Sequence, residues 1–381
     1  MKKLYWRPNR VSRVELLFIA AFSLAGLVLV ESFPQVKKQR FYQEKMTASR
    51  LALVAMRELK QERHRRKIPI HDEADPARTG LIGDLLSPIA SNSGHLGSKQ
   101  TSVNPNFAAV LVHYLRRAEV NPGDVVAVGV SGSFPAINVS AYAALKTLEA
   151  KPSVVASTSA SQWGATHPHF TWLDMEACLQ RRRVFSTRAV AASLGGIDDR
   201  ALGLSNEGKR LLRSAVERAG IPLLSDETFE DAVETRMKLY ADHARGRPIK
   251  AYINVGGGTV SVGTHIGKKL FHPGLNRSAP VGGETPDSVM LRFAHSDVPV
   301  IHMSGINRIA ERYGFPISPV TMPRVGEGKV FVTVQYNPWL TAGVLLAIVG
   351  LAILFLRLHV GMRLSSSMSA PKQRSAPSEM V

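Results

Sequence analysis

The chain has 381 residues, more than one ordinary domain, since domains cluster at about 100–200 residues. Hydrophobic residues make up 45% of it and charged residues 20%, which excludes a disordered or collagen-like chain. The single cysteine, Cys178, excludes an intrachain disulfide and a zinc site with several cysteines. The formal net charge of +18 favours a polyanion or an anionic membrane surface as a partner and does not choose between them.

Two apolar segments, residues 14–30 and 339–356, are predicted to be transmembrane helices. Each approaches the roughly 20 residues that cross the hydrocarbon core of a membrane. For the first segment a cleavable signal peptide is the alternative, but no small-x-small cleavage pattern follows it. For the second segment a buried core helix is the alternative, and the absence of any charged residue argues against it.

The flanks of these two segments predict their orientation. Basic residues are concentrated in residues 1–13 and 357–381, so the positive-inside rule places both ends of the chain in the cytoplasm. The loop between the spans is then extracytoplasmic. A single cysteine suits a bacterial envelope domain without disulfides, so the predicted location is the bacterial cell (inner) membrane. Residues 31–338 carry 39 Lys and Arg against 28 Asp and Glu, so this outer part is itself basic, with a net charge of +11.

Residues 31–67 are predicted to form a basic amphipathic helix. Beyond Pro34 this segment contains neither Gly nor Pro, and its apolar residues recur at intervals near three and four. We expect the helix to continue the first span as a stalk. The alternative is a solvated helix that packs on its own domain.

Residues 68–335 are predicted to form an α/β domain with a mostly parallel sheet and flanking helices. After a loop-rich entry, short β-branched runs alternate with helical patterns, which is typical of such sheets. The predicted strands are residues 125–130, 154–157, 251–255 and 298–303. The predicted helices are residues 107–117, 136–149, 207–219, 227–243 and 307–313. Ligands of these sheets bind beyond the carboxyl ends of the strands, so the loops there are the candidate site.

The first candidate loop is GVSGSFPAIN, residues 129–138. It follows a predicted strand, and Pro135 opens a helix at a position where its missing N–H costs nothing. Small and hydroxyl residues at a helix N-terminus suit a carboxylate or phosphate, so Ser131, Gly132 and Ser133 are candidate ligand-binding residues. Residues 129–133, GVSGS, also nearly match the G-x-S-x-G nucleophile elbow, with Ser133 in place of the last glycine. An ordinary tight turn is the third interpretation.

A serine hydrolase would need a base and a group that orients it. The chain order of α/β hydrolases leaves Asp297 and His302 as weak candidate partners for a catalytic Ser131, with Asp287 and His295 as a second choice. The chain has 12 His, so a downstream histidine is uninformative. The spacing does not support a hydrolase, and we expect binding rather than catalysis.

The second candidate loop, residues 154–176, concentrates hydroxyl and aromatic side chains after a predicted strand. Such side chains suit a polar, chain-like ligand. The candidate ligand-binding residues are Ser157, Ser159, Ser161, Trp163 and Asp174. His167 and His169 with the same aspartate could ligate a metal, but H-x-H is a weak signal, and two ordinary loop histidines are the preferred interpretation. No metal and no cofactor are therefore expected.

The third candidate loop is YINVGGGTVSVG, residues 252–263. Glycine-rich turns of this form cradle phosphates in sugar-kinase and actin-like folds, but Asn254 stands where those folds usually carry a metal-binding aspartate. The chain also has no G-x-x-x-x-G-K-[ST] sequence. A tight turn or a backbone-lined binding site is therefore preferred to an ATPase. The candidate ligand-binding residues here are Gly256, Gly257, Gly258 and Thr259.

Two spans bracket this outer α/β domain, and four motifs follow in order: GVSGSFPAIN, SQWGATHPHFTWLDME, AASLGGIDDRALGLSNEG and YINVGGGTVSVG. With these features the chain resembles the bacterial family of poly-gamma-glutamate system proteins, over essentially its whole length. The resemblance implies a role in the membrane machinery that makes and exports poly-gamma-glutamate, alongside a ligase and its membrane partners. It implies no catalytic residues, so the candidate site residues come from the loops alone.

We therefore expect a membrane-anchored accessory component of poly-gamma-glutamate synthesis or export, with the synthase and export membrane proteins as partners. Its outer domain would bind the anionic polymer or tether partner proteins, and nucleic acid is not an expected partner. The polymer carries one carboxylate per residue, which agrees with a basic domain and anion-ready loops. The alternatives are an envelope serine hydrolase or transferase that acts through Ser131, and a purely structural partner whose loops are only turns.

Overall fold

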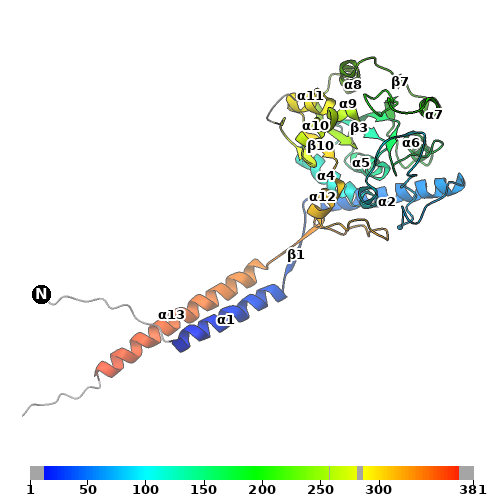
Figure 1. Cartoon of the computed structure of the whole chain (residues 1–381). Coiled ribbons are helices and arrows are strands. Elements are labelled where there is room, and N and C mark those ends of the chain that lie inside the picture. Colours follow the sequence, from blue (N-terminus) through cyan, green and yellow to red (C-terminus); the bar gives the residue numbers. More distant parts are fainter. Residues whose placement is uncertain (1–12, 257, 281–285, 369–381) are drawn as a thin grey trace, which may run out of the picture. The chain divides into compact units, whose positions relative to one another are not determined.

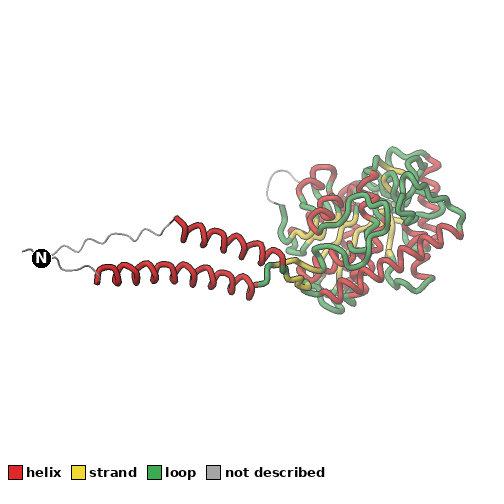
Figure 2. Tube along the Cα trace, turned by 90° about the horizontal axis from the view of Figure 1, so that it is seen from below, coloured by secondary structure: helices red, strands yellow, loops and turns green. Residues whose placement is uncertain are grey.

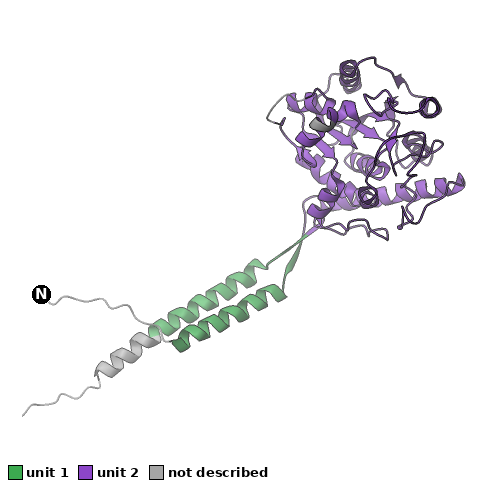
Figure 3. Cartoon of the chain, in the orientation of Figure 1, with its two compact units in different colours: residues 1–37, 333–381 green, residues 38–332 purple. Residues whose placement is uncertain are grey.

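The computed structural model describes residues 13–256, 258–280 and 286–368 and divides into two compact units (Figure 3). The helical unit consists of residues 1–37 and 333–381, and the α/β unit consists of residues 38–332. A short two-stranded sheet, β1 (Gln35–Lys38) with β11 (Val332–Gln335), lies where the chain passes between the units.

The helical unit contains two long apolar helices, α1 (Arg13–Ser32) and α13 (Pro338–Met368), which pack side by side (Figures 1 and 2). Gly26 lies at their contact, because a Cβ there would come within 2.5 Å of the Val344 side chain. Each helix has a stretch of 20 residues long and apolar enough to span a membrane, as predicted. In α13 none of this stretch is buried in the structure, unlike a core helix of a globular domain.

The basic segment after the first span forms a separate helix, α2 (Tyr42–Arg65), in place of a stalk that continues α1. Pro34 and β1 interrupt the helical path, since proline cannot supply the N–H that a helix interior needs. Ala48, Ala52 and Leu59 of α2 are fully buried, and the helix packs against α4 (Phe107–Arg117) and α5 (Pro135–Thr147). The helix thus belongs to the core of the α/β unit.

The α/β unit is built on a seven-stranded sheet in the order β7-β6-β4-β3-β8-β10-β9. Six strands run parallel: β3 (Val125–Ser131), β4 (Lys151–Ser157), β6 (Ala189–Ser193), β7 (Leu223–Leu224), β8 (Ile249–Val255) and β10 (Val300–Met303). The edge strand β9 (Gly274–Asn276) is antiparallel. This confirms the predicted mostly parallel sheet, and the four predicted strands are β3, β4, β8 and β10.

Helices cover both faces of this sheet, which confirms the predicted α/β class (Figure 1). One buried cluster joins the sheet to α2, α4, α5, α6 (Trp172–Arg181) and α12 (Ile306–Tyr313). The other joins it to α8 (Phe229–Ala244), α9 (Thr259–Val262) and α11 (Val289–His295). The remaining helices are α3 (Leu96–Ser102), α7 (Asn206–Ala219) and α10 (Thr264–Leu270).

The topology predicts where a ligand would bind, at one edge of the sheet. From β3 the chain winds outward through β4 and β6 to β7, and then returns to the other side of β3 for β8 and β10. Strands β3 and β8 are therefore neighbours at a topological switch point, where open α/β sheets bind ligands beyond the carboxyl ends of the strands.

The carboxyl edge carries a row of polar residues on one face of the sheet. Ala127 and Val155 pack toward the layer of α8, α9 and α11, so by the alternation of strand residues Ser131 and Ser157 face that layer too. The strand register pairs Ser131 with Ser157, and it pairs Asn254 with His302. Four neighbouring strands thus bring polar side chains to the same edge.

Candidate functional site

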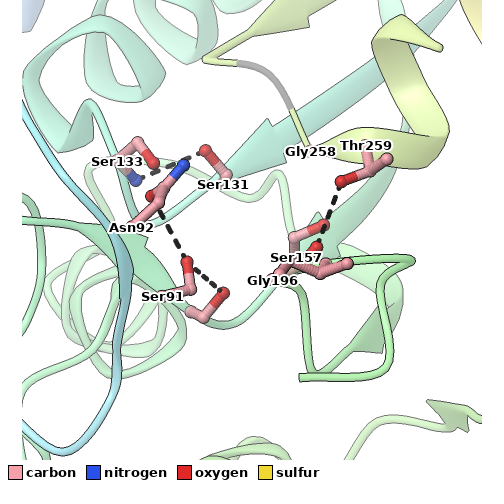
Figure 4. Close-up of a pocket in the computed structure, with 10 residues that line it drawn as sticks. Ser91, Asn92, Ser131, Ser133, Ser157, Gly196, Gly258 and Thr259 are labelled. Carbon is pink, nitrogen blue, oxygen red and sulfur yellow. Dashed lines mark hydrogen bonds between the residues drawn. The ribbon is translucent and has the colours of Figure 1, made fainter. Parts of the chain in front are cut away.

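A polar pocket of about 80 Å³ opens at this carboxyl edge (Figure 4). It collects residues from four strand ends and from β2 (Ala90–Asn92), which pairs with β5 (Ala160–Ser161) in a small separate sheet. None of its lining residues is charged, and five of them are serines. We call it the serine pocket; it is lined by Ser91, Asn92, Ser131, Ser133, Ser157, Ser159, Gly196, Ile197, Gly258 and Thr259.

Hydrogen bonds among the loops fix the walls of the serine pocket (Figure 4). The Ser133 N–H donates to Ser131 Oγ at 3.3 Å, and Ser159 Oγ donates to Ser91 Oγ at 3.2 Å. Thr259 Oγ1 donates to the Gly196 carbonyl at 3.2 Å. Segments far apart in the sequence are therefore joined around one small polar space.

One wall of the pocket is anchored by a buried ion pair. The wall contains Gly196 and Ile197, and Asp199 follows them with a left-handed φ of 61°. Asp199 Oδ1 accepts a hydrogen bond from Ser157 Oγ at 3.1 Å, and its carboxylate is paired with Arg236 of α8. Each of these two charged side chains is only 3% exposed, so the pair ties the loop to the helical layer.

The structure does not bring the predicted base and orienter to Ser131. Asp297 precedes β10 at the amino edge of the sheet, whereas Ser131 ends the parallel strand β3 at the carboxyl edge. His302 instead contacts Ser304 Oγ at 2.6 Å and Asn254 Nδ2 at 3.0 Å. Among the described residues neither a histidine nor a carboxylate hydrogen-bonds Ser131.

His302 is held as a neutral residue. It is fully buried, and burial lowers its pKa to about 4, with a smaller contribution from the positive charge of Lys268. A histidine with so low a pKa is a weak proton acceptor at neutral pH. Its contacts with Ser304 and Asn254 therefore describe a satisfied core histidine.

Six of the predicted ligand-binding residues line the serine pocket, and others have different neighbours. Trp163 lines a separate cavity of about 420 Å³ together with His71 and Asp84. Asp174 forms the capping box of α6 with Thr171, and it also pairs with Arg218 at 3.0 Å. These contacts give Asp174 a structural role.

The remaining predicted residues lie beside the serine pocket or outside the described chain. The Gly132 N–H donates to the Ser159 carbonyl at 3.2 Å, and Gly256, with φ of 92°, approaches Ser131 Oγ so closely that a Cβ would come within 2.5 Å. Gly257 lies outside the described residues. Among the described residues no group of three His, Cys, Asp or Glu could hold a metal ion, and His167 with His169 is no exception.

A buried lysine lies behind the pocket wall, and no pattern in the sequence indicates it. Lys99 of α3 is only 2% exposed, and its Nζ donates to the carbonyl of Ser133 and lies 2.7 Å from Ser161 Oγ. It also lies over the ring of Phe134 at 4.2 Å. Burial, with a smaller contribution from the positive charge of Lys268, lowers the pKa of Lys99 to about 7.

The geometry defines an α/β protein with a hydroxyl-lined pocket at the switch point of its sheet. Comparisons of the chain with protein-family models, with curated proteins and with solved structures found no match. What the site can do follows from its own chemistry: hydroxyl groups and a helix N-terminus can hold an anion, and a buried lysine can act as a counter-charge or as a base.

Proposed function

We propose that this protein is a membrane-anchored accessory component of poly-gamma-glutamate synthesis or export, and that its α/β unit binds the polymer through carboxylate groups. The observation that carries this proposal is the serine pocket at the switch point, with Lys99 directly behind its Ser133 wall. Poly-gamma-glutamate is proposed as the ligand because the four sequence motifs resemble those of the poly-gamma-glutamate system proteins. The synthase and export membrane proteins are the proposed partners.

The size and chemistry of the serine pocket support a carboxylate ligand. A carboxylate has about the volume of two water molecules, at roughly 30 Å³ each, which suits a cavity of this size. Hydroxyl groups donate readily to a carboxylate, and the positive end of the α5 helix dipole follows Ser133. Lys268 adds positive charge nearby, while the negative charge of Asp199 is compensated by Arg236.

Polymer binding is expected to depend on this pocket. Gly258 has ordinary backbone angles, φ −56° and ψ 144°, and a Cβ there would lie 3.2 Å from Ser157 Oγ. Gly258→Val should therefore fill the pocket and crowd Ser157 without straining its own backbone, and it should weaken binding of poly-gamma-glutamate at least about tenfold, since the loss of about 1.4 kcal/mol suffices for that. The measurement is retention of the polymer by the full chain in detergent at low salt.

A matched control uses the same new side chain elsewhere. Ser296 is exposed at the end of α11, before β10, and Ser296→Val should leave binding unchanged. Binding by the unaltered chain should also fall as salt rises, because the Debye length is only about 8 Å at physiological ionic strength. Equal binding by Gly258→Val and the unaltered chain would leave tethering of partner proteins as the better proposal.

The proposed location is a bacterial inner membrane, with both ends of the chain in the cytoplasm and the α/β unit outside. The two long apolar helices and their basic flanks support it. Cys178 is fully buried, so a cysteine introduced at Leu86, which is 82% exposed, can be labelled selectively. We expect a membrane-impermeant maleimide to label Leu86→Cys in intact cells, and a reporter fused after Val381 to report cytoplasm. If the maleimide label and the reporter indicated the same side of the membrane, the proposed topology would be wrong.

A further inference from the structure

We propose that Lys99 and Ser161 form a catalytic dyad in which Ser161 is acylated by an amide or ester substrate, with Lys99 as the base. This goes beyond the binding role, and it assigns the nucleophile to a serine other than Ser131. The inference begins from the contact of 2.7 Å between Lys99 Nζ and Ser161 Oγ.

Both members of the dyad are held against the loop that follows β3. Lys99 Nζ donates to the Ser133 carbonyl, which fixes the amine in one position. The backbone N–H of Ser161 donates to Ser133 Oγ at 3.1 Å, which fixes the serine. Ser133 lines the serine pocket, so the reacting pair adjoins the space in which a ligand would lie. Ser161 retains 8% of its surface exposed.

The charges around Lys99 favour its neutral, basic form. Among the described residues no aspartate or glutamate pairs with it, and Lys268 of α10 opposes a second positive charge. Helix α12 also packs against α3, but its charged residues Arg308, Glu311 and Arg312 form no ion pair with Lys99. A desolvated lysine without a counter-ion exchanges its proton near neutral pH and can serve as a general base.

The other deeply buried lysine of the α/β unit provides a contrast. Lys45 of α2 is 1% exposed and donates to the Val330 carbonyl at 2.9 Å. Burial lowers its pKa to about 8, while the neighbouring Glu44 raises it. No serine hydroxyl hydrogen-bonds Lys45 in the described part of the chain. Lys45 is therefore a structural lysine, and Lys99 differs from it by its contact with a hydroxyl.

The proposed reaction is an acyl transfer. Neutral Lys99 takes the proton of the Ser161 hydroxyl as Oγ forms a bond to the substrate carbonyl carbon. The bond from that carbon to the amine nitrogen or alcohol oxygen breaks, and the leaving group takes its electron pair and the proton from Lys99. Water then attacks the acyl-serine ester, gives its proton to Lys99, and releases a carboxylic acid while Ser161 regains its hydrogen.

The surroundings of the dyad suit a substrate with a carboxylate next to the reacting carbonyl. The N-terminus of α5 follows Ser133, and the positive end of its helix dipole can stabilise the oxyanion that forms during acylation. The serine pocket would hold the neighbouring carboxylate, and this part of the inference rests on the proposed function. The acylation step does not rest on it, since a small electrophile can react with Ser161 without the pocket.

A fluorophosphonate probe tests the dyad on the full chain in detergent. Ser161 Oγ would form a bond to phosphorus with loss of fluoride, and peptide mass spectrometry would locate the adduct. We expect the adduct on Ser161, and a labelling rate that rises with pH through about 7 as Lys99 loses its proton. Ser161→Ala should abolish labelling, and Lys99→Met should slow it at least about 100-fold, the usual contribution of a general base.

Three further variants separate a base from a structural lysine. Lys99→Arg keeps the charge and the donors but cannot deprotonate, so it should be as slow as Lys99→Met. Lys45→Met and Ser296→Ala change residues outside the serine pocket and the dyad, so both should be labelled at the rate of the unaltered chain. An adduct on Ser131 or Ser304, labelling of Lys99→Arg at the unaltered rate, or a rate that is flat between pH 6 and pH 9 would each overturn the proposal. Failure to bind poly-gamma-glutamate would not overturn the dyad, since the probe reaction is independent of the polymer.

Discussion

Replacing Arg236 by Met is expected to lower the free energy of unfolding by about 3–5 kcal/mol. The guanidinium of Arg236 pairs with Asp199, and both side chains are only 3% exposed. Removing the cation leaves a buried carboxylate without its counter-charge, which costs far more than the lost contact itself. Among the described residues, the hydrogen bond from Ser157 would be the one partner left to the carboxylate, so the pocket wall at Gly196 should loosen as well. Urea unfolding followed by tryptophan fluorescence measures the change.

Two comparisons separate the buried charge from other effects of the substitution. The double variant Arg236→Met with Asp199→Asn removes both charges, so it should recover much of the lost stability. Arg292→Met removes an arginine whose pairing with Asp287 is partly exposed, and it should cost at most about 1 kcal/mol. A loss below about 1 kcal/mol for Arg236→Met would show that the ion pair does not hold this loop.

Gly132→Val should damage the site much more than Ser131→Ala. A Cβ on Gly132 would lie 3.0 Å from both Ala160 Cβ and the Ser159 carbonyl oxygen, and the valine methyl groups would add further overlap. Overpacking of this kind costs about 1–3 kcal/mol. The Gly132 carbonyl also accepts from the Ala165 N–H at 2.7 Å, so a shift of this residue would disturb the neighbouring loop. Polymer binding should fall at least about tenfold.

Ser131→Ala is the matched mild variant of the same loop. Ser131 Oγ accepts from the Ser133 N–H at 3.3 Å and reaches the Val255 carbonyl only at 3.5 Å, so about 1 kcal/mol is the expected cost. Binding and unfolding of both variants can be measured in parallel. If Ser131→Ala lost polymer binding while Gly132→Val kept it, the expectation would be wrong. The Ser131 hydroxyl, and not the backbone at Gly132, would then be essential for binding.

The central strands could be predicted because they are short, apolar and bounded by Gly, Pro or Ser. The runs at β3 and β8 are rich in valine and isoleucine, which fit a buried parallel sheet. Strand β6 was missed, since AVAAS contains one β-branched residue and three alanines and carries no strand pattern. Helix α6 was read as part of a binding loop, although Thr171 and Asp174 at its start match a capping box.

Six of the ten residues that line the serine pocket could be predicted, because the ends of parallel strands meet at one edge of the sheet. Ser157 ends a predicted strand, Ser131 and Thr259 follow predicted strands, and all three line the pocket. Ser91 and Asn92 come from a segment expected to be only a loop-rich entry, and the short pairing of β2 with β5 brings them there. A three-residue strand gives no periodicity to recognise.

Lys99 could not be identified from the sequence. It lies in a short helix, it is one of 48 lysines and arginines in the chain, and no motif surrounds it. Its special property is burial without a carboxylate partner, which depends on how α3 packs beside the β3 loop and Ser161. Tertiary contacts, and not local pattern, determine which cation of a basic chain is removed from water.

The proposed binding role is tested most directly by titrating the full chain in detergent, at low salt, with two forms of a γ-linked glutamyl oligomer. One form carries free carboxylates and the other has every carboxylate converted to its methyl ester. We expect the acid form to bind at least about tenfold more tightly than the ester, and Gly258→Val to remove most of that difference. Equal affinity for acid and ester, or an acid preference that persists unchanged in Gly258→Val, would contradict recognition of carboxylates in the serine pocket.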